Sequence, residues 1–133
     1  MRETYTITLP LPHKHLSPNA RPHWRAKAMA VKVYRSLTGL TATGILTGQA
    51  NLRPMWKAAT VQGRAFFKDA RRRDKDNILA SLKAAFDGLK DAGLIEDDSG
   101  LTHLPMEVLV DKKNPRIELV VTKQPDTGEE ARA

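Results

Sequence analysis

Residues 71–93 read RRRDKDNILASLKAAFDGLKDAG and contain the clearest helix in the chain. Asp76 or Asn77 is a suitable cap for its start, and Gly93 is the residue type that commonly ends a helix. Between Asn77 and Ala92 the apolar residues recur at helical spacing, which predicts an amphipathic helix packed on the core. This apolar stripe consists of Ile78, Leu79, Leu82, Ala85, Phe86 and Leu89.

The rest of the chain predicts a mixed sheet around this helix. A second helix is expected from about residue 23 to residue 37, ended by Gly39. The following residues 38–55 are expected to form a mobile loop, with a short helical piece as an alternative for part of it. Turn residues 111–115 predict that the two last strands form a hairpin, and Gly63 predicts an irregularity in the strand before them. Strands are expected at residues 4–9, 56–67, 104–110 and 117–122.

The element order β-α-β-α-β-β predicts one small α/β (α+β) domain over residues 1–123. We expect a mixed sheet of about four strands with two main helices packed on it, and a polar, disordered tail at residues 124–133. The 133 residues suffice for a single core, and the absence of cysteine excludes disulfides and thiolate metal sites. The N-terminus lacks the apolar region of a signal peptide, and no stretch is long and apolar enough to span a membrane. We therefore expect a cytoplasmic protein.

The chain carries a formal charge of +7, from 22 lysines and arginines against 15 aspartates and glutamates. The tail after Lys123 contains three acidic residues and one basic residue, so the preceding body has 21 basic and 12 acidic residues, or +9. Such an excess favours a polyanionic partner, most often nucleic acid. The alternative interpretation is that the charge serves solubility alone.

Two carboxylates, Asp74 and Asp76, stand two positions apart just before the first helix described above. In extended backbone, positions i and i+2 point to the same side, so both side chains can converge on one point. Neighbouring carboxylates repel each other unless a positive charge lies between them. Oxygen ligands suit Mg²⁺ or Mn²⁺ rather than Zn²⁺. The alternative is that this motif only caps the helix.

Two further charged groups flank this pair in the sequence. The cluster Glu96-Asp97-Asp98 follows the helix and reaches the same site only if the chain folds back after Gly93. The run Arg71-Arg72-Arg73 directly precedes the pair, and its cations could hold DNA phosphates beside a metal that promotes phosphodiester hydrolysis. Alternatively, these arginines form an ordinary solvated face.

Several blocks of the chain resemble, in the same order, the RusA-type Holliday-junction resolvases. The resemblance covers most of residues 4–122, with residues 38–55 uncertain, and the combination is more specific than any single block. The matching blocks are Ile7-Thr8-Leu9-Pro10-Leu11-Pro12, Ser17-Pro18-Asn19, Arg71-Arg72-Arg73-Asp74-Lys75-Asp76-Asn77, Lys83-Ala84-Ala85-Phe86-Asp87-Gly88-Leu89 and Ala92-Gly93-Leu94-Ile95-Glu96-Asp97-Asp98.

The resemblance implies a small mixed α/β homodimer that cuts four-way DNA junctions symmetrically with Mg²⁺ or Mn²⁺. It also implies a bacterial origin, or a phage or prophage origin. By matching position, Asp74 and Asp76 are implied as the paired metal ligands and Asp98 as the third essential carboxylate. Asp97 is a further candidate ligand.

The chain departs from the family pattern at one catalytic position. Members commonly carry a lysine three residues after the motif asparagine, where this chain has Ala80. Lys83 lies three residues further on, and Asp76, Ala80 and Lys83 follow the i, i+4, i+7 spacing of one helix face. Lys83 is therefore a candidate catalytic residue, and the alternative is that it only solvates the helix.

Asn19, Trp24 and Arg25 join the three arginines as candidate DNA-binding residues. An aromatic ring beside cations can stack on an unpaired base, whereas a tryptophan that opens a helix can equally pack on the core. The function expected from all these features is a metal-dependent endodeoxyribonuclease that resolves four-way junctions. The alternative is a junction-binding protein of the same fold that does not cleave. Ala80 favours this alternative, because it stands where the family commonly has a catalytic lysine.

Overall fold

The sheet has five strands: β1 (Thr4–Leu9), β2 (Ala59–Phe67), β3 (Leu101–His103), β4 (Glu107–Val110) and β5 (Arg116–Lys123). Strand β2 has neighbours on both sides in this mixed sheet. It pairs antiparallel with β5, which in turn pairs antiparallel with β1, and on its other side it pairs in parallel with β3 and β4. The computed structural model describes residues 3–47 and 55–124.

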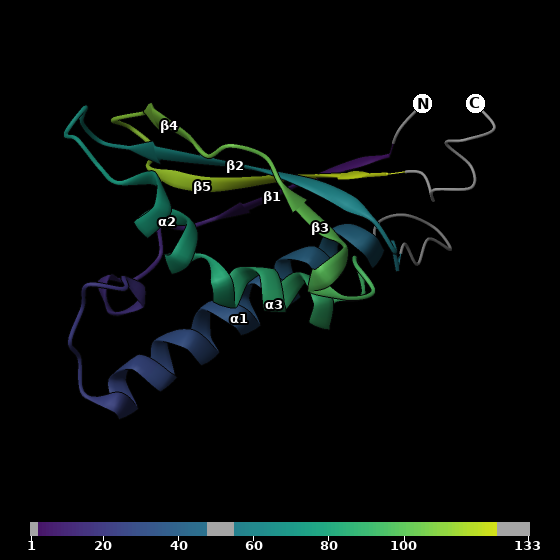
Figure 1. Cartoon of the computed structure of the whole chain (residues 1–133), viewed down its shortest axis with the longest axis horizontal. Coiled ribbons are helices and arrows are strands. Elements are labelled where there is room, and N and C mark those ends of the chain that lie inside the picture. The colour runs from purple at the N-terminus through teal and green to yellow at the C-terminus, as the bar shows by residue number, and fades with distance from the viewer. Residues whose placement is uncertain (1–2, 48–54, 125–133) are drawn as a thin grey trace.

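The helices lie on one face of this sheet (Figure 1). Side chains alternate between the two faces along each strand, so the sheet face that the helices cover is apolar and buried. The residues at the centre of this face are Ile7, Leu9, Val61, Ala65, Ile117, Leu119 and Val121. The helices are α1 (Trp24–Thr47), α2 (Lys75–Ser81) and α3 (Lys83–Asp91), with short 3₁₀ turns at Lys14–Leu16 and Asp98–Gly100. This α+β arrangement with two main helices, α1 and α3, confirms the predicted fold class. Within the described ranges, no helix combines the length and apolar composition needed to cross a membrane.

Helix α1 is longer than predicted, because it continues through Gly39 and Gly44 to Thr47. The expected loop at residues 38–55 is therefore wrong for its first ten positions, and residues 48–54 lie outside the described part. Glycine in a helix interior costs about 1 kcal/mol, but here burial outweighs this cost. Tyr34, Thr38, Ala42 and Leu46 form a buried row at four-residue spacing. Gly39 lies where α1 passes α3, and a Cβ there would make an ordinary contact with the Gly88 carbonyl oxygen at 3.5 Å.

The predicted helix over residues 77–92 is two helices that meet at Leu82. The side chain of Asp74 caps α2, so the cap lies two or three residues before the expected Asp76 or Asn77. Leu82 has φ −95° and ψ 1°, and its N–H donates to the Leu79 carbonyl at 3.0 Å, which tightens the last turn of α2. Leu82 is fully buried, so burial of this side chain stabilises the bend. Gly93, with φ +80°, ends the helical segment as predicted.

The predicted hairpin between residues 104–110 and 117–122 does not form. Strand β4 pairs with β2 instead of β5, because β2 lies between them in the sheet. The intervening residues 111–115 cross the end of β2, where the Asp111 N–H donates to the Phe67 carbonyl at 2.8 Å. The strand expected over residues 56–67 begins at Ala59, and its register is regular through Gly63. Of the expected tail, only Gln124 lies among the described residues.

The close crossing of α1 and α3 makes Gly88 a sensitive position. A Cβ there would lie 2.5 Å from the Arg35 carbonyl oxygen and 2.8 Å from the Thr38 Cβ. Gly88→Ala should therefore lower the free energy of unfolding by about 1–3 kcal/mol in urea denaturation. Gly44 is the matched control, since a Cβ there meets nothing within 4 Å. Gly44→Ala should raise stability by up to about 1 kcal/mol, and equal effects of the two variants would contradict this packing.

Candidate functional site

Asp74 lies at the junction between the loop after β2 and the start of α2. Its backbone is extended, with φ −79° and ψ 120°, and its Oδ1 accepts hydrogen bonds from the N–H groups of Asp76 at 2.8 Å and Asn77 at 3.3 Å. Lys75 and Asp76 are already helical, so the expected extended i, i+2 geometry is wrong. Both carboxylates still belong to the first turn of one helix, and both residues are exposed. The capping interpretation of Asp74 is confirmed, and it occupies only one carboxylate oxygen.

A hollow of about 340 Å³ adjoins Asp74. It is bounded by the loop after β1, by the end of β2 and by the side of α2, so residues far apart in the sequence meet there. Its polar lining consists of Ser17, Arg73, Asp74, Asn77 and Ser81, and its apolar lining of Leu11, Pro12, Phe67, Ile78 and Ile117. The sequence singled out the loop with Ser17 and the motif with Asp74 separately, but no pattern indicated the apolar lining between them.

The second acidic cluster lies at the other end of the α2–α3 segment (Figure 1). After Gly93 the chain runs beside residues 55–56: the Trp56 N–H donates to the Leu94 carbonyl at 3.1 Å, and the Glu96 N–H to the Trp56 carbonyl at 2.9 Å. This pairing carries Asp98 onward into a 3₁₀ turn, where it is exposed. Across residues 3–47 and 55–124, no three acidic or histidine side chains are grouped as ligands for one metal ion.

Asp97 has contacts of its own within the acidic cluster. Its carboxylate accepts a hydrogen bond from the Ser99 hydroxyl at 2.7 Å and pairs with the Lys90 ammonium at 3.2 Å. These two contacts, the Ser99 bond first, lower the pKa of Asp97 to about 2. Asp97 is thus held as an anion beside the end of α3, apart from Asp74 and Asp76.

The donor chemistry of Asp74 and Asp76 alone suits Mg²⁺. This ion is usually bound through one or two protein carboxylates and completes its coordination with water and substrate phosphates. Asp74 has one carboxylate oxygen outside its capping bonds, and Asp76 is exposed on the same helical turn. The pair therefore fits a magnesium site that a phosphate completes, whereas a preformed site of three carboxylates does not match the described residues.

The three arginines before Asp74 differ in their surroundings. Arg73 is half-buried: it donates to the carbonyls of Asp69 at 3.1 Å and Arg71 at 2.9 Å and to the Asp69 carboxylate at 2.9 Å. Its guanidinium also lies 3.9 Å from the centre of the Phe67 ring. The Arg71 N–H and then the Arg73 side chain lower the pKa of Asp69. Arg73 thus organises the loop that presents Asp74, while Arg71 and Arg72 are exposed.

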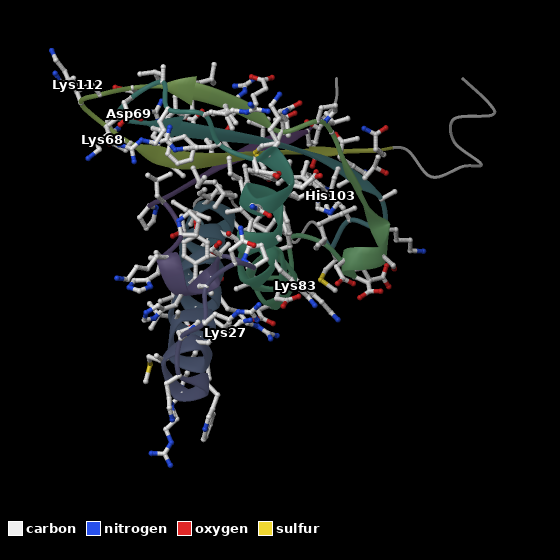
Figure 2. The ribbon with its side chains drawn as sticks, turned by 60° about the vertical axis from the view of Figure 1, so that its left-hand side comes forward. Lys27, Lys68, Asp69, Lys83, His103 and Lys112 are labelled. Carbon is white, nitrogen blue, oxygen red and sulfur yellow. The ribbon has the colours of Figure 1, made fainter. Side chains whose placement is uncertain are left out.

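Lys83 is the exposed first residue of α3, in the helical layer below the sheet (Figure 2). The bend at Leu82 interrupts the helix between Ala80 and Lys83, so the continuous face expected for Asp76, Ala80 and Lys83 is wrong. No hydrogen bond or ion pair holds the Lys83 ammonium among the described residues. Its side chain is therefore free to move toward a bound anion.

The remaining candidates lie on the N-terminal loop and at the start of α1. Asn19 is exposed, and its N–H donates to the Ser17 hydroxyl at 3.3 Å. Trp24 is 69% exposed, so its expected alternative of packing on the core is wrong. The Arg25 guanidinium lies 5.2 Å from the centre of the Trp24 ring. These side chains are accessible from solvent.

The contrast between Arg73 and Arg72 can be tested by stability. Arg73→Ala should lower the free energy of unfolding by about 1–3 kcal/mol, because the Asp69 carboxylate loses its ion pair and the carbonyls of Asp69 and Arg71 lose the guanidinium donor. Arg72→Ala, the neighbouring control, should change stability by less than about 0.5 kcal/mol. Urea denaturation of both variants measures this difference. Equal stabilities would show that the Arg73 contacts do not hold the loop.

No family model matches this chain. An uncharacterized protein of Xylella fastidiosa (strain Temecula1 / ATCC 700964) is 34% identical over 111 residues, which cover 77% of this chain and 67% of that protein. An identity of this size over two thirds of the relative is sufficient to place both in one family. The chain therefore belongs to the same family as this uncharacterized protein of Xylella fastidiosa.

Proposed function

We propose that this protein is a metal-dependent endonuclease that resolves four-way DNA junctions, as its resemblance to the RusA-type resolvases implies. The observation that carries the proposal is the hollow beside Asp74. Two blocks that resemble the family separately, the loop with Ser17 and the motif with Asp74 and Asn77, line this one hollow. A site assembled from such distant segments is typical of an active centre on a fold scaffold.

Asp74 and Asp76 would hold Mg²⁺ or Mn²⁺ in this proposal. When bound, the metal polarises the scissile phosphate and favours formation of hydroxide from water. Arg71 and Arg72 are exposed beside the carboxylates and would bind flanking phosphates, which fixes the register of the strand. The Lys83 ammonium would stabilise negative charge that develops on the phosphate.

Asp98 and Asp97 take no step in this mechanism. Asp98 stands as the third essential carboxylate by resemblance, but it is not grouped with Asp74 and Asp76 among the described residues. The Asp97 carboxylate is engaged by Ser99 and Lys90. Paired cutting of a junction requires two active centres, so the proposed working unit is a homodimer with one centre per chain. A cytoplasmic site of action and a bacterial, phage or prophage origin belong to the same proposal.

One feature favours a second candidate, a junction-binding protein without cleavage. The chain has Ala80 at the family lysine position, and the helix bend separates Ala80 from Lys83. In that case the exposed basic residues would bind the junction but nothing would replace the missing ammonium. The two candidates share DNA binding and differ only in metal-dependent cutting.

Asp74→Asn and Asp76→Asn should each reduce junction cleavage by at least about 100-fold while junction binding persists. Each variant removes one carboxylate from the proposed metal pair, and asparagine caps a helix about as well as aspartate, so α2 should remain folded. Cleavage of a labelled four-way junction and gel-shift binding measure the two effects. Glu107→Gln, which neutralises an exposed carboxylate on β4, is the control and should cut normally. Full cleavage by either aspartate variant would refute the assignment.

Lys83→Ala should slow cleavage about tenfold or more at saturating junction, with little change in binding, because the ammonium acts on charge that develops during reaction. Single-turnover cleavage rates separate this effect from affinity. Lys90→Ala is the control, since Lys90 lies at the far end of α3 and pairs with Asp97. An unchanged rate in Lys83→Ala would show that Lys83 only faces solvent.

A further inference from the structure

The first half of α1 makes only partial contact with the core, through Ala30 and Val31. Between Trp24 and Val33 none of its residues is buried, whereas the second half has the buried row that begins at Tyr34. Both views show this half extending away from the sheet (Figures 1 and 2), and Lys27, labelled in Figure 2, lies on it. The first turns of α1 therefore present most of their side chains to solvent.

Trp24, at the tip of this projection, is the most unusual residue on it. It is 69% exposed, whereas the chain's other tryptophan, Trp56, is 4% exposed and stacks on Tyr5. The His23 ring stacks on one side of Trp24 with centroids 5.8 Å apart, and Arg25 lies near the same indole. A large aromatic ring held among cationic or polar groups in water is suited to stacking on another flat ring system.

The helix face on which Trp24 lies distinguishes it from the other exposed apolar residues. Trp24, Lys27, Val31 and Tyr34 follow spacings of three and four residues, so Trp24 continues the face that contacts the rest of the protein further along. Met29, Val33 and Leu40 are exposed on a different stripe, and Met29 and Val33 line a groove that also includes Leu37. Trp24 and Lys27 therefore form a surface separate from this apolar stripe.

The positive charge around Trp24 at the start of α1 favours a polyanionic partner. Residues 4–68 contain lysines and arginines but no aspartate or glutamate. Arg21, Arg25, Lys27 and Lys32 are exposed on or beside the free half of α1. A second copy of this tip would bring like charges together, whereas a polyanion would neutralise them.

We propose that Trp24 stacks on an unpaired base at the branch point of a DNA junction, with Arg25 and Lys27 on the neighbouring phosphates. This inference rests on the proposed function and adds a recognition element for branched over linear DNA. Bases at a branch point can expose the flat faces that a duplex keeps covered, and stacking of a base on an aromatic side chain is insensitive to sequence.

Tryptophan fluorescence tests this contact directly, with divalent metal omitted so that the junction stays intact. Because Trp56 is buried, the difference between wild type and Trp24→Phe reports on Trp24. A four-way junction should quench this emission and protect it from acrylamide, and linear duplex should not. Trp24→Ala should weaken junction binding about tenfold without weakening duplex binding, whereas Trp24→Phe should retain most of the affinity. Met29→Ala, on the other stripe, is the control and should bind like wild type.

The outcomes separate this inference from the proposed function. If wild type binds the junction but the Trp24 emission and the Trp24→Ala affinity stay unchanged, the stacking contact is refuted and the proposed function stands. If Trp24 emission changes with protein concentration before DNA is added, the tip packs on a second copy and the inference is equally refuted. If wild type binds no junction at all, the proposed function fails and the inference fails with it.

Discussion

The hydrogen-bonded pairing of β2 with β5 is the interaction on which the rest of the architecture depends. It extends from Ala59 opposite Lys123 to Phe66 opposite Arg116. It places the buried residues of both strands on the sheet face that the helices cover. Because β2 is central, its end brings Phe67 to the hollow and starts the loop that carries Asp74. The same pairing sets β1 beside β5, so the loop after β1 arrives at the opposite wall of that hollow.

Local patterns in the sequence predicted the elements whose stability is mainly local. The alternation in residues 4–9 and the stop at Gly93 were sufficient to locate β1 and the end of α3. Tertiary packing decided the features that the sequence did not predict. Helix α1 passes Gly39 because α3 lies against it, and β4 joins β2 because β5 is already paired on both sides. The bend at Leu82 follows from burial of that leucine, which an apolar stripe alone does not reveal.

The site was predicted in part for similar reasons. The sequence placed Asp74 and Asp76 together at the start of a helix, and its two interpretations of Asp74 are compatible, because the cap occupies only one carboxylate oxygen. It could not tell where the chain goes after Gly93, on which the position of Asp98 depended. In the structure this segment pairs with Trp56, and among the described residues Asp98 is not grouped with Asp74 and Asp76. It also gave no sign that Arg73 would bind its own loop, since three consecutive arginines are equivalent until the fold buries one of them.

The central proposal is metal-dependent cutting of branched DNA at Asp74 and Asp76. The most direct measurement uses the wild-type protein and a four-way junction in which each strand is end-labelled in turn, incubated with Mg²⁺ or with a chelator. We expect paired nicks at symmetry-related positions in two strands of like polarity, formed only with Mg²⁺, and no cutting of linear duplex of the same sequence. Stable binding of the junction without any nick in Mg²⁺ or Mn²⁺ would contradict this proposal.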